Sequence, residues 1–261
     1  MLTAKSRRSL SAHSIAECQV LILAGGRGTR LRSSFRTGPK SMAPVGKRPF
    51  LAYLLRWLHD AGLCDVIVCV GYKKAQIQSW LGDGHNWGLR VKYSEEKKLL
   101  GTAGALKRAE KLVSSPLCLV VNGDSFLDVN LRAMFRFHRQ RRALATIALA
   151  RVPDSTRYGA VTLDRSRRLI AFQEKEKNLP EKIDRGSPRR FQLINGGVYL
   201  LEKQVLAAIP PRRAVSLEKE IFPGIAGHRL YGFVTQGYFI DIGVPADFAR
   251  AQSELPRRLR A

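Results

Sequence analysis

The chain has 261 residues, 45% of them hydrophobic and 25% charged, a composition that suits a folded protein and excludes a disordered or fibrous one. Its 45 Lys and Arg outnumber its 21 Asp and Glu, so the formal net charge is +24. Such an excess indicates a polyanionic partner, namely nucleic acid, an anionic membrane or a phosphorylated small molecule.

The N-terminal region, residues 1–17, is basic and rich in serine but lacks the apolar core of a secretory signal, so we expect a flexible tail. Apolar runs elsewhere stay short of the about 18 residues needed to cross a bilayer. The cysteines lie in or beside apolar segments without C-x-x-C spacing; they are Cys18, Cys64, Cys69 and Cys118. They indicate small buried side chains in a reducing compartment, hence a cytoplasmic location, rather than a zinc site or a disulfide framework.

Residues 18–144 alternate β-rich runs with helical patterns. Strands are predicted at 19–24, 66–70, 89–93 and 117–121, mostly as continuous apolar runs that end in turn residues. Helices are predicted at 50–58, 73–81, 103–112 and 131–139, where apolar residues recur at helical spacing. The alternation predicts an α/β fold with a Rossmann-like, open, mixed but mostly parallel sheet that carries helices on both faces.

Residues 145–255 are richer in strands. The predicted strands lie at 145–152, 159–163, 169–172, 191–201, 231–234 and 238–240, and a helix is predicted at 245–254. We interpret this half as an antiparallel or mixed extension of the first sheet. Because no linker rich in Gly, Ser and Pro separates the halves, we predict one domain, 18–255, between the tail at 1–17 and a basic tail at 256–261.

A glycine-rich turn follows the first predicted strand, where backbone N–H groups can approach phosphate oxygens. The turn does not match the dinucleotide-binding pattern G-x-G-x-x-G, because Leu31 occupies the position of the third glycine. It is not a P-loop either, because no Gly-Lys-Ser/Thr follows. No acid occurs between Cys18 and His59, whereas eight basic residues do. Among these, Arg30 and the proline-flanked Lys40 could neutralise a triphosphate.

Two sequence motifs in this region, L-A-G-G-R-G-T-R-L at 23–31 and G-P-K-S-M-A-P-V at 38–45, are followed by six more in order. These lie at 100–106, 122–124, 158–161, 172–175, 195–199 and 237–243. Over residues 19–254 the pattern resembles the sugar-1-phosphate nucleotidylyltransferases (NDP-sugar pyrophosphorylases). The resemblance implies a nucleotide-diphospho-sugar transferase fold, with a nucleotide-binding part at 18–144 and a sugar-binding part at 145–255. It also implies a Mg²⁺-dependent reaction of an NTP with a sugar 1-phosphate, which yields an NDP-sugar and pyrophosphate.

The expected metal ligands are Asp124 and Asp241. Asp124 ends a buried strand, where ligands collect in open α/β sheets, and Asp241 follows a second short strand. Magnesium prefers one or two carboxylates together with phosphate oxygens and water. Either aspartate alone would be taken for a turn residue, but the pair stands in matching motifs. The resemblance implies catalytic roles in charge neutralisation for Arg30, Lys40 and Lys175.

The expected nucleotide-binding residues are Leu23, Ala24, Gly25, Gly26, Gly28, Thr29, Glu96, Gly101 and Thr102. A carboxylate only accepts hydrogen bonds, so Glu96 favours guanine, which presents adjacent N1–H and N2–H₂ donors, over uracil or thymine. Glu95 or backbone groups could instead read the base, or both acids could simply be solvated. Gly101 and Gly104 are expected to leave room for a flat base.

The expected sugar-binding residues are Asn122, Gly159, Glu174, Asn195 and Gly196. The family often has Pro after its Glu-Lys pair, which is Glu174-Lys175 here, whereas Glu176 and Lys177 follow in this chain. This departure leaves the identity of the residues around the sugar undefined by the sequence. The motifs look most like the branch that makes GDP-D-glycero-D-manno-heptose, which makes GTP and that heptose 1-phosphate the expected substrates. Mannose-1-phosphate guanylyltransferases and glucose-1-phosphate nucleotidylyltransferases are the enzymatic alternatives.

Two functions of other classes compete with this interpretation. A nucleic-acid-binding protein would interleave exposed aromatic residues with basic ones, whereas the arginines here are scattered in loops. A regulatory relative that binds nucleotide-sugar without turnover would be expected to have lost Arg30, Lys40, Asp124 or Asp241, and all four are present. We therefore expect neither nucleic acid nor membrane as a partner, and leave homo-oligomerisation open.

Overall fold

The computed structural model describes residues 15–26, 28, 31, 35, 37–153, 158, 160–173 and 191–259. Five of the expected site residues lie outside the described residues: Thr29, Arg30, Gly159, Glu174 and Lys175. The strands are β1 (Gln19–Leu23), β2 (Pro44–Val45), β3 (Arg48–Pro49), β4 (Asp65–Val70), β5 (Arg90–Glu95), β6 (Leu117–Asn122), β7 (Ser125–Leu127), β8 (Ala145–Val152), β9 (Ala160–Leu163), β10 (Leu169–Gln173), β11 (Gln192–Glu202), β12 (Leu230–Thr235) and β13 (Phe239–Asp241).

Besides these strands, the described residues form seven α-helices, four 3₁₀ turns and one π-helical turn. The α-helices are α1 (Phe50–Asp60), α2 (Lys74–Leu81), α3 (Gly101–Ala109), α4 (Leu131–Gln140), α5 (Lys203–Ala208), α6 (Phe222–Ile225) and α7 (Pro245–Arg258). The 3₁₀ turns are η1 (Ile15–Glu17), η3 (Lys40–Met42), η4 (His85–Trp87) and η5 (Glu110–Leu112), and the π-helical turn is η6 (Leu217–Ile221).

In the large sheet, β1 lies between β4 and β6. β1 pairs in parallel with β4 on one side and with β6 on the other, and β4 pairs in parallel with β5. Antiparallel pairing of β6 with β11, and of β11 with β8 and β9, then adds the second half of the chain. The predicted α/β fold with an open, mixed sheet is confirmed. Since the chain moves from β1 outward to β5 and then returns to β6, the strand order reverses between β1 and β6, where open α/β sheets bind ligands.

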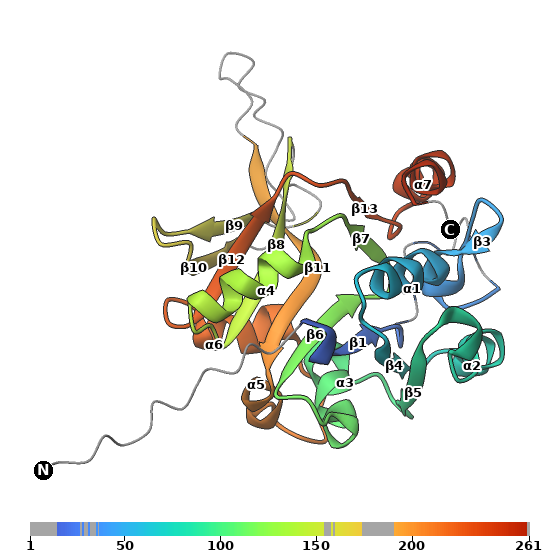
Figure 1. The fold of residues 1–261 in the computed structure, drawn as a ribbon, viewed down its shortest axis with the longest axis horizontal. Coiled ribbons are helices and arrows are strands. Elements are labelled where there is room, and N and C mark those ends of the chain that lie inside the picture. Colours follow the sequence, from blue (N-terminus) through green and yellow to red (C-terminus); the bar gives the residue numbers. More distant parts are fainter. Residues whose placement is uncertain are drawn as a thin grey trace, which may run out of the picture.

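Alternation along the parallel strands divides the hydrophobic core between the two faces of the sheet. In β1, Val20 and Ile22 belong to one cluster with α1, α2 and α4, whereas Leu21 belongs to a second cluster with α3 and α5. Both faces are therefore covered, which explains why these strands are apolar throughout rather than alternating. Figure 1 shows α4 packed across β8 and β12 in the second half.

All four cysteines are free thiols in the structure. Cys18, Cys69 and Cys118 are buried, and burial raises the pKa of the Cys18 and Cys118 thiols to about 12. Thiols with such pKa values carry little thiolate near neutral pH and act as small hydrophobic side chains. In the described part of the chain, no helix combines the length and apolarity required for a membrane span.

The structure extends some predicted elements and adds others. The last helix, α7, continues to Arg258 rather than ending at residue 254, because Leu255 is buried and Arg258 stacks over the Tyr238 ring at 4.4 Å. At the other end, residues 15–17 form η1, with Ile15 buried. Strand β7, its antiparallel pairing with β13, and the segments α5, η6 and α6 were not predicted.

We expect Gly237→Ala to destabilise the fold. Gly237 lies between β12 and β13, and a Cβ at this position would overlap the carbonyl oxygen of Asp128. Because backbone fills this space, the strand must shift, at a cost of roughly 1–3 kcal/mol in the free energy of unfolding or more. Urea unfolding measures the loss. Gly224→Ala, where a Cβ meets open space, is the matched control, and equal midpoints for the two variants would contradict the prediction.

Candidate active site

A cavity of about 410 Å³ opens at the carboxyl ends of β1 and β6. Most of the expected site residues that the structure describes converge on it, although they come from several separate segments of the chain. Its walls are Leu23, Ala24, Gly25, Gly26, Gly28, Lys40, Ser41, Glu96, Leu99, Gly101, Thr102, Ala105, Asn122, Gly123, Asp124 and Gly243. The fold thus gathers the glycine turn, the acid after β5 and the aspartate after β6 at one position.

Lys40 joins the two aspartates that were expected to bind metal. Its Nζ donates to Asp124 Oδ2 at 2.7 Å and to Asp241 Oδ1 at 3.0 Å, and Lys40 is itself buried. The aspartates meet because β7 pairs with β13, which sets Asp241 opposite Ser125. Burial and the Asp124 charge raise the pKa of Asp241, while Lys40 opposes that shift. One buried cation therefore bridges two carboxylates at the edge of the cavity.

Local geometry holds Lys40 in this position. The residue begins η3 directly after Pro39, and two glycines lie against its side chain. Gly28 has φ +58, and a Cβ there would lie 2.9 Å from Lys40 Cβ. A Cβ on Gly243 would lie 2.8 Å from both Lys40 Nζ and Asp241 Oδ1. Glycine at these two positions therefore leaves the space that the ion pairs occupy.

The structure separates the two neighbouring acids at the end of β5, Glu95 and Glu96. Glu95 is bonded on the surface by Lys74 and Gln78, which hold the pKa of its carboxyl below the ordinary value. Glu96 instead lines the cavity, where its Oε2 accepts a hydrogen bond from Leu100 N at 2.8 Å. Burial raises the pKa of the Glu96 carboxyl. Of the two acids, Glu96 is the one placed beside the glycine turn.

The expectation that Gly101 and Gly104 leave room for a base is wrong. A Cβ on Gly101, whose φ is +71, would lie 2.5 Å from the Val215 carbonyl oxygen. A Cβ on Gly104 would lie 3.0 Å from the Arg213 carbonyl oxygen. The absent side chains therefore make room for backbone from the second half of the chain. Gly101 still lines the cavity with its main chain.

The described sugar-site residues fall into two groups. Asn122 lines the cavity, and its buried Oδ1 has no hydrogen-bond partner among the described residues. Asn195 lies outside the cavity wall and uses both ends of its amide, Nδ2 toward the Tyr199 hydroxyl at 3.0 Å and Oδ1 toward Gly197 N at 2.9 Å. A Cβ on Gly196 would clash with Leu127, so this glycine serves the packing of β11 against β7.

Some wall residues were missed by the sequence reasoning. Ser41 is buried with no partner for its Oγ within the part of the chain described, and Gly243 accommodates the Lys40–Asp241 pair. A Cβ on Gly123 would lie 2.8 Å from the Leu23 carbonyl oxygen, so this glycine lets the ends of β1 and β6 approach. All three stood inside the matched motifs, which was the available signal.

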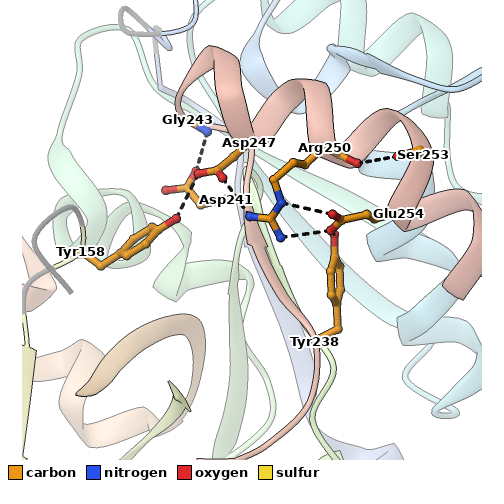
Figure 2. Close-up of polar contacts among 8 residues, drawn as sticks. All are labelled: Tyr158, Tyr238, Asp241, Gly243, Asp247, Arg250, Ser253 and Glu254. Atoms are coloured by element: carbon orange, nitrogen blue, oxygen red, sulfur yellow. Dashed lines mark hydrogen bonds and ion pairs between the residues drawn. The ribbon is translucent and has the colours of Figure 1, made fainter. Parts of the chain in front are cut away.

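A polar network fixes the start of α7 beside this region (Figure 2). Tyr158 donates to the buried Asp247 at 3.0 Å, and Arg250 donates to the other oxygen of Asp247 at 3.1 Å. Arg250 also forms a two-pronged bond with Glu254, at 3.2 and 3.1 Å, and Glu254 accepts from the Tyr238 hydroxyl at 2.8 Å. Such paired charge-assisted bonds are strong and directional. They tie Tyr158, which precedes an expected sugar-site glycine, to the helix that follows β13.

The sequence of this chain is similar to those of known proteins over most of its length. The family model described as nucleotidyl transferase matches residues 19–258. A D-glycero-alpha-D-manno-heptose 1-phosphate guanylyltransferase of Aneurinibacillus thermoaerophilus is 37% identical over 238 residues, which cover 91% of this chain and 98% of that protein. A mannose-1-phosphate guanylyltransferase of Mycobacterium tuberculosis is 35% identical over 92% of this chain, but the match spans only 65% of that protein.

A solved structure supports the same assignment. HddC from Yersinia pseudotuberculosis, determined in complex with GMP-PN, superposes with a TM-score of 0.78 at 30% sequence identity. The match covers 91% of this chain and 99% of that one. Fold, cavity position and sequence therefore agree, and the chain belongs to the nucleotidyl transferase family.

Proposed function

We propose that the protein transfers a guanylyl group from GTP to a sugar 1-phosphate, with release of pyrophosphate. D-glycero-D-manno-heptose 1-phosphate is the first candidate acceptor, because guanylyltransferases for this sugar match nearly from end to end. The observation that carries the proposal is the Lys40 ammonium, buried between two carboxylates at the edge of a cavity walled by the glycine turn. A glycine turn after a buried strand suits a polyphosphate, and a lysine paired with two carboxylates places a cation and potential metal ligands in the same wall.

In the proposed reaction a phosphate oxygen of the sugar 1-phosphate attacks the α-phosphorus of GTP in line, and the bond to pyrophosphate breaks. No covalent enzyme intermediate is required, so catalysis consists of alignment and charge neutralisation. Lys40 is proposed to stabilise the charge that develops on the phosphate oxygens. Arg30 and Lys175, which lie outside the described residues, are proposed to act with it.

Asp124 and Asp241 are proposed to hold Mg²⁺. The two carboxylates already approach a common cation, Lys40 Nζ, so they lie close enough to share one. The described residues contain no group of three or more His, Cys, Asp or Glu side chains placed to bind a metal, and phosphate oxygens and water would supply the other ligands, as is usual for Mg²⁺. When bound, the ion would neutralise phosphate charge as a Lewis acid.

Pyrophosphate release from a matrix of nucleotides and sugar 1-phosphates tests the proposal. GTP, ATP, UTP and dTTP are each combined with the 1-phosphates of D-glycero-D-manno-heptose, mannose and glucose. We expect the highest kcat/KM for GTP with the heptose. GTP with mannose 1-phosphate as the best pair would favour the mannose alternative. Turnover with UTP or dTTP alone would exclude the guanine assignment, and no turnover with any pair would favour a regulatory relative.

Glu96→Gln is expected to weaken discrimination for guanine. Gln can still accept from Leu100 N through its carbonyl oxygen, but its NH₂ group would face the N–H donors of guanine. A mismatched hydrogen-bond pair of this kind costs about 1–3 kcal/mol, or about 5- to 150-fold in kcat/KM for GTP. Kinetics with GTP, ITP and UTP measure the change. Glu95→Gln is the neighbouring control, and equal losses in both variants would contradict the role of Glu96.

The expected cytoplasmic location, the absence of a nucleic-acid or membrane partner and any assembly with copies of the same chain stay predictions. Size-exclusion chromatography with light scattering tests the assembly state. Binding to heparin that persists at high salt would argue against a small-molecule partner, because simple charge attraction is screened by salt.

A further inference from the structure

Glu218 lies at the centre of a hydrogen-bonded cluster that the proposed reaction does not use. It stands in η6, a segment that the sequence motifs did not include. Its Oε1 accepts from the Tyr199 hydroxyl at 3.1 Å, and its Oε2 accepts from Thr102 Oγ1 at 2.9 Å and from Ser216 Oγ at 2.8 Å. All three partners are hydroxyl groups that donate to this one side chain, which only accepts in these hydrogen bonds.

This carboxylate determines the direction of the hydrogen bonds around Tyr199. The Tyr199 side chain is fully buried, and burial together with the Glu218 charge raises the pKa of its hydroxyl. The hydroxyl hydrogen therefore points to Glu218, which leaves the phenolic oxygen as an acceptor. Asn195 Nδ2 donates to that oxygen at 3.0 Å, and the Asn122 side chain is hydrogen-bonded to the same group.

Two residues expected to border the sugar thus depend on one hydroxyl. Because the Asn195 amide nitrogen faces Tyr199, its Oδ1 is placed to accept from Gly197 N. The arrangement occurs where β11 breaks register between Asn195 and Tyr199, and where Gly197 has φ +75. With its nitrogen turned to Tyr199, Asn122 keeps a buried Oδ1 that has no partner among the described residues. Because Asn122 lines the cavity, the orientation of its amide determines which polar atom lies behind this part of the wall.

The same carboxylate reaches the nucleotide side of the cavity. Thr102, a wall residue at the start of α3, donates to Glu218 and accepts from Leu217 N at 2.8 Å. The Val215 carbonyl accepts in turn from the amides of Ala103 and Gly104 at 2.9 and 3.2 Å. The segment that carries Glu218 is therefore attached to the helix that lines the nucleotide side.

We propose that Glu218 is a positioning residue that acts through Tyr199 to fix the amide orientations of Asn122, in the cavity wall, and of Asn195, directly behind it. The assignment rests on the proposed function for the identity of the ligand, but the amide orientation itself is a property of the free protein. Glu218 does not touch the reacting atoms. It sets which end of each amide faces Tyr199, and through Thr102 it links this orientation to the nucleotide side of the cavity.

The first test compares kinetics of Glu218→Gln, Tyr199→Phe and the double variant. Gln offers an NH₂ group toward Tyr199, which reverses the hydrogen bond and turns the asparagine amides around. We expect KM for the sugar 1-phosphate to rise about 10-fold or more in each single variant, while KM for GTP changes by less than about 3-fold. If Glu218 acts through Tyr199, the double variant is no worse than the poorer single one.

Glu220→Gln is the matched control. Glu220 lies two residues further along η6, is exposed, and is bonded to Arg213 and Ser216 N rather than to Tyr199. We expect wild-type kinetics for it. Additive losses in the double variant, or an equal rise of both KM values in Glu218→Gln, would overturn the proposal. So would a lowered melting temperature with unchanged KM values, because a packing role alone predicts that result.

A second test does not depend on turnover. NMR spectra of protein labelled with ¹⁵N-asparagine report the side-chain amides of Asn122 and Asn195 in the absence of ligand. We expect both resonances to shift in Glu218→Gln and Tyr199→Phe and to stay in place in Glu220→Gln. Unshifted resonances overturn the positioning role whatever the enzyme does. Shifted resonances in a protein that uses no sugar 1-phosphate would instead refute the proposed function and leave the amide control standing.

Discussion

Lys40→Met is expected to lower the rate of nucleotidyl transfer by about 100- to 1000-fold, the loss typical for removal of one group that stabilises developing charge. Methionine keeps the length and packing of the side chain against Gly28 but removes the ammonium that bridges Asp124 and Asp241. The effect should fall on kcat more than on either KM, because the charge is needed most in the transition state. Steady-state kinetics with GTP measure it.

The same substitution is expected to change how stability depends on pH. The pKa of Asp241 is already above its ordinary value of 3.8, through burial and Asp124, and Lys40 opposes this shift. A carboxyl whose pKa is raised on folding binds more protons folded than unfolded, so its contribution to stability is present below 3.8 and is lost as pH rises through the folded pKa. Without Lys40 that pKa rises further, so the loss extends to higher pH.

Urea unfolding between about pH 4 and pH 8 measures this dependence. We expect the free energy of unfolding of Lys40→Met to fall more steeply with pH than that of the wild type, and the extra slope to disappear in Lys40→Met/Asp241→Asn. Lys47→Met, an exposed lysine in the same acid-free stretch, is the control. Parallel curves for wild type and Lys40→Met would show that the ion pairs do not set the charge state of Asp241.

Asp241→Asn is expected to reduce turnover with Mg²⁺ by about 100-fold or more, because one of two proposed carboxylate ligands becomes neutral. The fold should survive. The Asn Oδ1 can still accept from Lys40 and from Gly243 N, the two donors that Asp241 Oδ1 serves. Loss of a buried charge that repels Asp124 also removes an unfavourable contact. Melting temperature should therefore change little while activity collapses.

Metal binding, measured directly, separates a metal role from a general loss of charge. Electron paramagnetic resonance counts Mn²⁺ bound with nucleotide, and we expect weaker binding in Asp241→Asn and in Asp124→Asn. Asp128→Asn, an exposed carboxylate just past β7, is the control and should bind Mn²⁺ like the wild type. Undiminished Mn²⁺ binding in both variants would remove Asp124 and Asp241 from the metal site, even if their activity is low.

Much of the fold was accessible from the sequence because its signals are local. The apolar runs of β1, β4 and β6 reflect burial on both faces, and the 3.6-residue spacing of α1 and α4 reflects burial on one. Strand β13 was predicted at 238–240, but its partner β7 was missed because three residues are too few to show a period, and the pairing joins segments far apart in the chain. Turn η6 was missed because Glu218 and Glu220 suggest a solvated surface, whereas Glu218 bonds the hydroxyls of the half-buried Thr102 and the buried Tyr199.

The candidate site shows the same division between features set by neighbouring residues and features set by distant ones. The glycine turn and the proline-flanked Lys40 are set by immediate neighbours, so the sequence alone could nominate them. The contacts that give Lys40 its setting span 84 residues to Asp124 and 201 residues to Asp241, and no local pattern encodes pairs so distant. The mistaken interpretation of Gly101 and Gly104 has the same origin, since the backbone that fills their space comes from residues 213 and 215.

The sequence by itself determined the class of fold, the acid-free basic stretch around the glycine turn and the identity of the groups that could meet phosphate and metal. Only the tertiary structure decided which of Glu95 and Glu96 lines the cavity, that one buried ammonium holds two carboxylates, and that a carboxylate outside every matched motif controls the Tyr199 hydroxyl. Composition and residue spacing show which chemical groups a chain contains. The desolvation, distance and bond direction that give those groups their chemistry exist only once strands remote in sequence pair.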